Sequence, residues 1–343
     1  MRNLFILAPM VALSPSLLAD EVKSRIGAEF DIGYFNTSGN GVTDSKANSG
    51  FTQQKMDVFF HFEQEKVKAM VQVDLNNLGI TTTSSVSTDD SGNTSVASSS
   101  TAKALDDAWV QYSFSETFNL KWGYEWAFNN YYGLHSWFYF GPHLDLAHGT
   151  PKLEVNGKVA GVTYGLQLWE DESADQTVDD KDSGLFSNYA AKVQYNVEGV
   201  EAGIIYHMDG GYDIKDASGN TVKAEDATGY QVYAKYTHKS AAHAWLRMTQ
   251  RQITSEQEGG ADTSIGLGYT GIDRVGIYLA NHTVETIVAK NGESKSGTSL
   301  DFKVDYAMNK NLKYFIQHIN YSKDFSGAAE AFSTTALGLQ ARY

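Results

Sequence analysis

The sequence predicts an all-β fold, a transmembrane antiparallel up-and-down β-barrel of about sixteen strands. Three observations lead to this prediction. Apolar and polar residues alternate with a period of two in segments that recur from end to end, as they do in strands. Short and long connections alternate between these segments. The segment 337–343 alternates in the same way, and Tyr343 closes the chain with an aromatic ring.

The alternating segments give the predicted strands in chain order. They are 25–35, 55–63, 67–76, 107–114, 118–125, 153–155, 162–168, 189–197, 200–206, 230–236, 242–248, 265–269, 275–279, 300–306, 312–316 and 337–343. Asn156-Gly157 is a favoured tight-turn pair and predicts the turn of the third hairpin. Long loops are predicted at 77–101, which is rich in Ser and Thr and expected to be flexible, and at 208–226. A fourteen-stranded barrel is the alternative if 272–321 divides differently.

The beginning of the chain predicts export. Residues 1–19 combine the positive charge of Arg2, an apolar stretch at 4–13 and small residues before Asp20, which is the pattern of a secretory signal cleaved after Ala19. No later run approaches the roughly 18 apolar residues of a membrane helix. An exported chain of this kind is a periplasmic domain or a barrel, since only helices and closed barrels satisfy the backbone in lipid. We therefore expect 20–343 to form one outer-membrane barrel.

The composition agrees with this class. The chain has 31 Gly and only 4 Pro, which suits long strands, and its 20 Tyr are typical of rings at two lipid–water interfaces. The absence of Cys excludes a disulfide framework, and a formal charge of −14 argues against nucleic acid as a partner.

The two faces of the predicted strands exclude a soluble sandwich. Tyr34, Tyr112, Trp122 and Tyr124 lie on the apolar face near strand ends, as in the aromatic girdle of a membrane barrel. The opposite face is charged along most strands, and a water-filled lumen tolerates such a face.

Two segments carry a resemblance to a known family. Leu105–Tyr112 reads LDDAWVQY and Phe118–Tyr124 reads FNLKWGY. Together they resemble the strands preceding the constriction loop of Gram-negative general porins. The resemblance implies a homotrimer of sixteen-stranded barrels whose third long loop, here 126–150, folds into the lumen. It also implies contact with outer-membrane lipid and lipopolysaccharide, and with the barrel-assembly machinery through Tyr343. The chain departs from the family at Glu125, at the terminal Tyr, and in lacking an acidic third-loop motif.

The predicted third loop is rich in aromatic residues. Folded into the lumen, such rings narrow the pore; they could anchor the loop, pack at a subunit contact, or stack on sugars. The predicted constriction aromatics are Trp126, Tyr131, Tyr132, Trp137, Phe138, Tyr139 and Phe140. His135, His143 and His148 have spacings that match no common metal-ligand pattern, so we predict no metal and no cofactor.

Charged residues on the polar face are candidates for the pore lining. The basic ones are Arg25, Lys55, Lys68, Lys121, Lys192, Lys235, Arg247 and Arg251, and the acidic ones are Asp57, Asp74, Asp107, Glu125 and Asp145. Opposed charges across a narrow lumen would create a transverse field, if the loop folds inward. The acidic loop 170–184 predicts a mild preference for cations.

The predicted function is passive diffusion of small hydrophilic solutes and ions. A porin selective for oligosaccharides, using the third-loop aromatics, is the alternative. An enzyme is not predicted, because the one tempting pair, His135 and Ser136, is adjacent on an extended chain and points apart.

Overall fold

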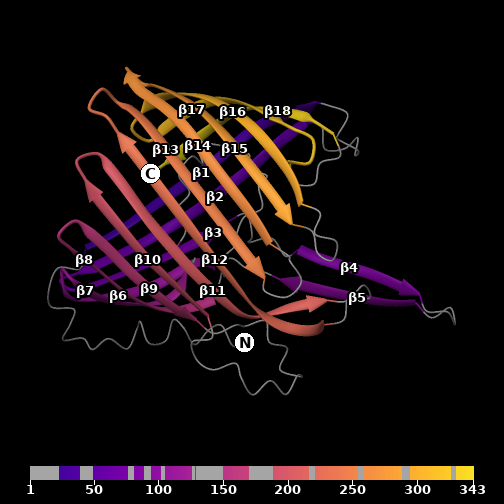
Figure 1. Ribbon diagram of the computed structural model, residues 1–343, viewed down its shortest axis with the longest axis horizontal. Helices are drawn as coiled ribbons and strands as arrows, with labels where there is room; N and C mark the ends of the chain where they lie inside the picture. Colours follow the sequence, from indigo (N-terminus) through magenta and orange to yellow (C-terminus); the bar gives the residue numbers. More distant parts are fainter. Residues whose placement is uncertain are drawn as a thin grey trace.

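The computed structural model describes residues 23–38, 49–75, 81–88, 94–101, 105–125, 128, 150–169, 188–215, 221–253, 259–287, 294–325 and 330–343. Sixteen strands form one closed antiparallel barrel, and β4 and β5 form a separate two-stranded sheet (Figure 1). The predicted strand number is confirmed. Among the described residues, no helix is long and apolar enough to cross a membrane.

The strands follow one another around the barrel in chain order, with β3 next to β6. Their bounds are β1 Lys23–Ser38, β2 Ser49–Gln64, β3 Val67–Asp74, β4 Thr81–Thr88, β5 Thr94–Thr101, β6 Leu105–Ser115, β7 Phe118–Glu125, β8 Thr150–Val159, β9 Val162–Trp169, β10 Asn188–Val197, β11 Val200–Lys215, β12 Thr221–Thr237, β13 Ala242–Ile253, β14 Gly259–Ile272, β15 Val275–Ile287, β16 Ser294–Asn309, β17 Leu312–Tyr321 and β18 Phe332–Arg342.

The barrel is closed by pairing of β1 with β18. Cα partners run from Glu29 opposite Arg342 to Ser38 opposite Ser333. Beyond the end of β18, Tyr343 continues the pairing, since its N–H donates to the Ala28 carbonyl at 2.8 Å and its carbonyl accepts from the Ala28 N–H at 2.9 Å. Closure leaves no free strand edge in this sheet, which is what a barrel in lipid requires.

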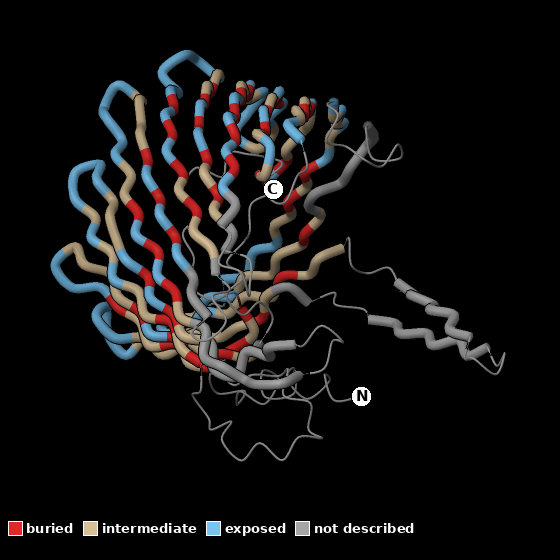
Figure 2. The backbone as a smooth tube through the Cα atoms, turned by 45° about the vertical axis from the view of Figure 1, so that its right-hand side comes forward, coloured by how far each residue is buried: buried red, intermediate tan, exposed pale blue. Residues whose placement is uncertain are grey.

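Burial alternates along the strands and separates two faces. Figure 2 shows buried and exposed residues in alternation along the barrel wall, with exposed short turns at one end. The outer face carries exposed apolar side chains such as Ile26, Ile265 and Leu279. The inner face carries buried polar ones, for example Asp57 and Gln317. Exposed apolar and buried polar residues are the reverse of a water-soluble fold, so the outer face suits lipid.

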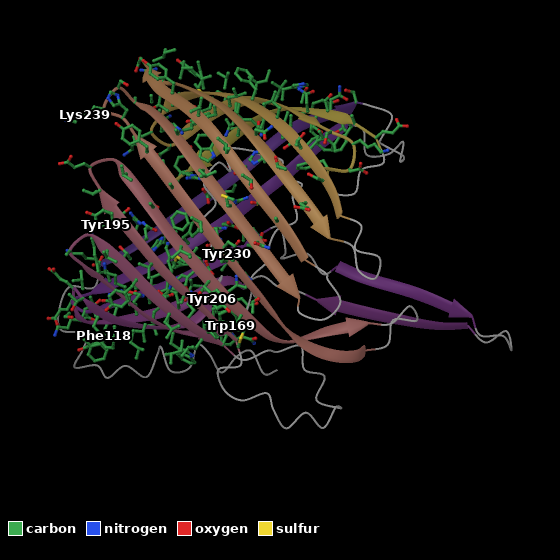
Figure 3. All side chains as sticks on the ribbon, viewed as in Figure 1. Phe118, Trp169, Tyr195, Tyr206, Tyr230 and Lys239 are labelled. Carbon is green, nitrogen blue, oxygen red and sulfur yellow. The ribbon has the colours of Figure 1, made fainter. Side chains whose placement is uncertain are left out.

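Aromatic residues on the outer face form two bands. The band near the short turns consists of Phe62, Phe114, Phe118, Tyr195, Tyr236, Tyr269, Tyr306 and Tyr314, all exposed. The other lies farther along the strands and includes Tyr34, Trp122, Tyr206 and Tyr230. Figure 3 shows Phe118 and Tyr195 near the turns and Tyr206 and Tyr230 farther from them. The predicted girdle residue Tyr112 is also exposed, and Tyr124 is half-buried.

Two sequence-based predictions of connections are wrong. Asn156-Gly157 is not a turn: β8 continues to Val159, which pairs with Val162, and the chain turns at Ala160 and Gly161 with φ of 48° and 84°. Most of the loop predicted at 208–226 is strand, because β11 and β12 stay paired out to Lys215 opposite Thr221.

The remaining short turns settle the strand count. The uncertain hairpin is formed by β14 and β15, with Ile272 opposite Val275. The fourteen-stranded alternative is therefore wrong. Within the loop predicted at 77–101, β4 and β5 pair in register from Thr81 opposite Thr101 to Thr88 opposite Thr94, where a flexible segment was expected.

Candidate functional site: the inner wall of the barrel

The root of the predicted third loop is held by a buried polar network on β7, β8 and β9. Glu125 ends β7, and Lys152 Nζ donates a hydrogen bond to the Glu125 main-chain oxygen at 2.5 Å. The Gln167 side-chain amide donates to Glu154 Oε2 at 3.0 Å and to Glu125 Oε1 at 3.4 Å. Lys121 forms ion pairs with both carboxylates, at 3.8 Å to Glu154. Lys121 thus pairs with both glutamates, and Lys152 binds the main chain at the point where β7 ends.

Phe128 lies inside the barrel just beyond this root. Its N–H donates to Gln167 Oε1 at 2.8 Å, and its ring packs against Trp169 and Ala190. The same ring covers Gly165, where an added Cβ would overlap it. These wall residues belong to the inner faces of β9 and β10, so Phe128 lies against the inner wall. The rest of the predicted loop lies outside the described residues.

A second buried network joins β13, β14 and β15. Arg247 forms an ion pair with Asp262, and both side chains are less than 10% exposed. The Ser264 hydroxyl lies 2.7 Å from His282 Nδ1, and the Gln231 amide donates to Thr249 Oγ1 at 3.1 Å on the neighbouring strand pair. The hydrogen bonds of this network pair polar groups that close packing removes from water.

Charged residues of both signs occur on both sides of the inner wall. Asp301 and Asp305 of β16 are buried with one lysine, Lys303, between them, and Glu29, Asp31 and Asp57 are buried on β1 and β2, three and four strands farther round the ring. The strands β7, β8, β10 and β12 carry the lysines Lys121, Lys152, Lys192 and Lys235. In ring order β16 lies half-way round from β8, and β2 lies half-way round from β12. Asp301 and Asp305 on β16 therefore lie across the barrel from β8, which carries both Lys152 and Glu154.

Aromatic and aliphatic side chains also occupy the inner wall, which sequence analysis did not predict. Phe315, Ile319, Tyr321 and Phe325 form one buried cluster with Val284 and Ala336. Trp245, Tyr278 and Ala280 form another, and His243 stacks on Trp245 with ring centroids 5.7 Å apart. The signal was present in the period-two pattern, since these residues share the phase of the polar face.

Several inner rings lie over glycines of the next strand. An added Cβ would overlap the Trp245 ring at Gly266, the His243 ring at Gly268 and the Phe315 ring at Gly338. A glycine leaves a gap in the pleated wall, and a ring from the neighbouring strand fills it. Trp245 and Phe315 are 4% exposed, so these rings are covered and offer no bare face for a sugar.

Most predicted lining residues that are described belong to the inner face. Asp57 accepts from the Gln72 amide at 3.0 Å, and Lys192 Nζ lies 5.9 Å from the Tyr233 ring centroid. Asp57 and Asp74 are Cα partners on β2 and β3, so these two acids are neighbours on the same wall, whereas Lys68 pairs with Glu63 at the other end of β3. The side chains of Lys55 and Arg251 lie outside the described residues, as do Asp145 and the listed loop aromatics from Trp126 to Phe140.

Inner-face side chains become more exposed toward the short turns. Lys23, Arg25 and Thr237 are exposed, whereas His207 and Gln167, farther along their strands, are 1% exposed. The inner wall is therefore close-packed in the middle and open at the short-turn end.

A closed ring of sixteen antiparallel strands, apolar outside and polar inside, defines a transmembrane β-barrel of the porin type. Solved structures similar in fold include porins and an outer-membrane channel.

The chain is similar in fold to an anion-selective porin from Comamonas acidovorans, with a TM-score of 0.64, 12% identity, and coverage of 94% of this chain and 100% of the porin. It is also similar to the trimer form of OmpT from Vibrio cholerae, with a TM-score of 0.59, 10% identity and the same coverage. A mutant of the Rh. blastica porin matches with a TM-score of 0.57, 14% identity and again 94% and 100% coverage. No protein-family model matches the sequence, and no curated protein is similar to it in sequence.

Proposed function

We propose that this protein is a passive diffusion channel of the outer membrane for small hydrophilic solutes and ions. The observation that supports the proposal most strongly is the pair of opposite faces on one closed ring. Exposed residues such as Leu279 and Phe302 suit lipid, and the charged inner wall suits water. A sixteen-stranded ring is wide enough to enclose an aqueous channel.

The third loop sets the size limit in this proposal. The inward position of Phe128 and the network around Gln167 support a loop that starts along the inner wall on the β9 side. Opposite charges on strands half-way round the ring, such as Asp57 on β2 and Lys235 on β12, support a transverse field across the lumen. Such a field orients polar solutes and disfavours apolar ones.

The formal charge of −14 supports a mild preference for cations. By analogy with the trimer form of OmpT, three such barrels assemble in the outer membrane after residues 1–19 are removed. The predicted binding of lipopolysaccharide and of the barrel-assembly machinery belongs to the same proposal.

Single-channel current in a planar bilayer tests this function. We expect ohmic steps, grouped in threes for a trimer, and a reversal potential of cation-selective sign in a KCl gradient. A folded barrel that gives no conductance steps would remove the proposal, and an anion-selective reversal potential would remove the cation preference alone. Saturable block of the current by oligosaccharides would favour the sugar-selective alternative.

A further inference from the structure

A cavity of about 320 Å³ opens at the short-turn end of the inner wall. Its lining contains the side chains of Lys23 and Arg25 from β1, His61 and Glu63 from β2, Lys68 from β3 and Trp109 from β6. In the proposed topology this end of the lumen faces the periplasm. The more deeply buried side chains of the inner wall, such as His207 and Gln167, lie farther from this end.

Strand register brings the basic residues of this cavity together. Glu63 of β2 is the Cα partner of Lys23 on one side and of Lys68 on the other. Arg25 is the partner of His61 in the next row. Three cationic side chains on adjacent strands therefore surround one carboxylate.

The charges of this cavity are not balanced within the described part of the chain. Glu63 pairs with Lys68 at 3.2 Å, and both side chains are about half exposed, at 53% and 49%. No described carboxylate lies within ion-pair distance of Lys23 or Arg25. The lining thus carries three cations against one anion. The buried networks near Gln167 and Arg247 differ, because each pairs its cations with acids.

The lining also offers an apolar surface. Trp109 is half-buried, and the His61 ring stacks on Phe59 with centroids 6.1 Å apart. A guanidinium group beside an aromatic wall suits a planar or tetrahedral anionic group attached to an apolar part, since arginine donates in a fixed fork to carboxylate and phosphate.

We propose that this cavity is an anion subsite that retains small solutes bearing a phosphate or carboxylate group at the periplasmic end of the lumen. The subsite rests on the proposed channel function. In a channel whose formal charge is negative, the subsite is a position that retains anions. The passage of an anion then depends on the side of the membrane from which it enters.

The experiment compares the open-channel current with and without inorganic phosphate at constant ionic strength, adding phosphate to each side in turn. Glucose 6-phosphate, with glucose as its uncharged control, then probes a solute with an attached ring. The test variant is Lys23→Gln/Arg25→Gln, which removes two cations without leaving an acid unpaired. Lys239→Gln/Lys310→Gln is the matched control, because it removes the same charge from exposed short turns outside the cavity.

We expect phosphate to reduce the wild-type current saturably, at lower concentration from one side than from the other. The half-effective concentration should rise about fivefold in the test variant, since each exposed ion pair contributes little and two are lost. The control variant should match the wild type. A linear, side-independent effect, or an equal shift in both variants, would overturn the subsite while leaving the channel in place. Absence of any conductance would instead overturn the proposed function.

Discussion

Gln167 connects the barrel wall to the root of the third loop, and Gln167→Leu tests that connection. The wild-type side chain is 1% exposed and uses both ends of its amide group. Its oxygen accepts from the Phe128 N–H at 2.8 Å, and its nitrogen donates to Glu154 at 3.0 Å and to Glu125 at 3.4 Å. Leucine has nearly the same volume and can make none of these bonds.

The magnitude follows from the groups left without a partner. A buried donor or acceptor that loses its hydrogen bond costs about 1–3 kcal/mol. Glu154 keeps Asn156, which donates to it at 2.6 Å, so the Phe128 N–H is the main group affected. With a smaller contribution from the two carboxylates, the anchored root should lose about 3 kcal/mol. Since about 1.4 kcal/mol is a factor of ten, the ratio of anchored to released root falls roughly a hundredfold.

Single-channel recording measures the consequence. We expect the variant to show frequent brief closures and a changed open-channel conductance, because a released loop root moves within the lumen. Gln317→Leu is the matched control, since Gln317 is equally buried and donates to Asp301 at 2.9 and 3.0 Å on β16, far around the ring from the loop root. Traces of Gln167→Leu that equal the wild type, or closures equally frequent in both variants, would refute this account of the loop root.

Three further predictions concern stability and assembly. Arg247→Met leaves buried Asp262 without its ion-pair partner and should lower the unfolding free energy by about 3–5 kcal/mol, measured by urea titration in micelles; Arg247→Met/Asp262→Leu should lose less. Gly266→Val places a side chain in the space of the Trp245 ring and should block folding on a heat-modifiability gel, with Trp245→Ala in the same chain restoring it. Leu279→Arg, on the outer face, should cost about 2–4 kcal/mol if it lies near the bilayer midplane, measured in lipid vesicles.

The barrel could be predicted because lipid outside and water inside impose one period on every strand. Turn chemistry was a weaker guide. Gly157 looked like a turn glycine, but its Cα approaches the Thr117 carbonyl so closely that an added Cβ would overlap it. A glycine is therefore needed inside β8, and pairing of Val159 with Val162 moves the turn onward. Composition at a single dipeptide cannot distinguish a turn from a close approach between strands.

The candidate site was less predictable, because its contacts depend on which strands are neighbours. The bond between Gln167 and the Phe128 N–H joins residues 39 positions apart, and it needs β8 between β7 and β9 in a fixed register. The same holds for Trp245 over Gly266, which are Cα partners on β13 and β14. Period two assigns each residue to a face, but only cross-strand register says what covers it.

Ring order also changes the interpretation of the charges. Asp57 and Asp74 were expected across the lumen from the basic residues, yet they are paired with each other on adjacent strands of one wall. The residues that do oppose one another belong to strands half-way round the ring, such as Asp57 on β2 and Lys235 on β12. Because the strands follow one another around the barrel in chain order, the distance between two residues in the sequence determines how far round the barrel they lie from each other. Which charges oppose one another across the lumen therefore depends on the order of the strands round the ring, and the period-two pattern of each strand does not contain that information.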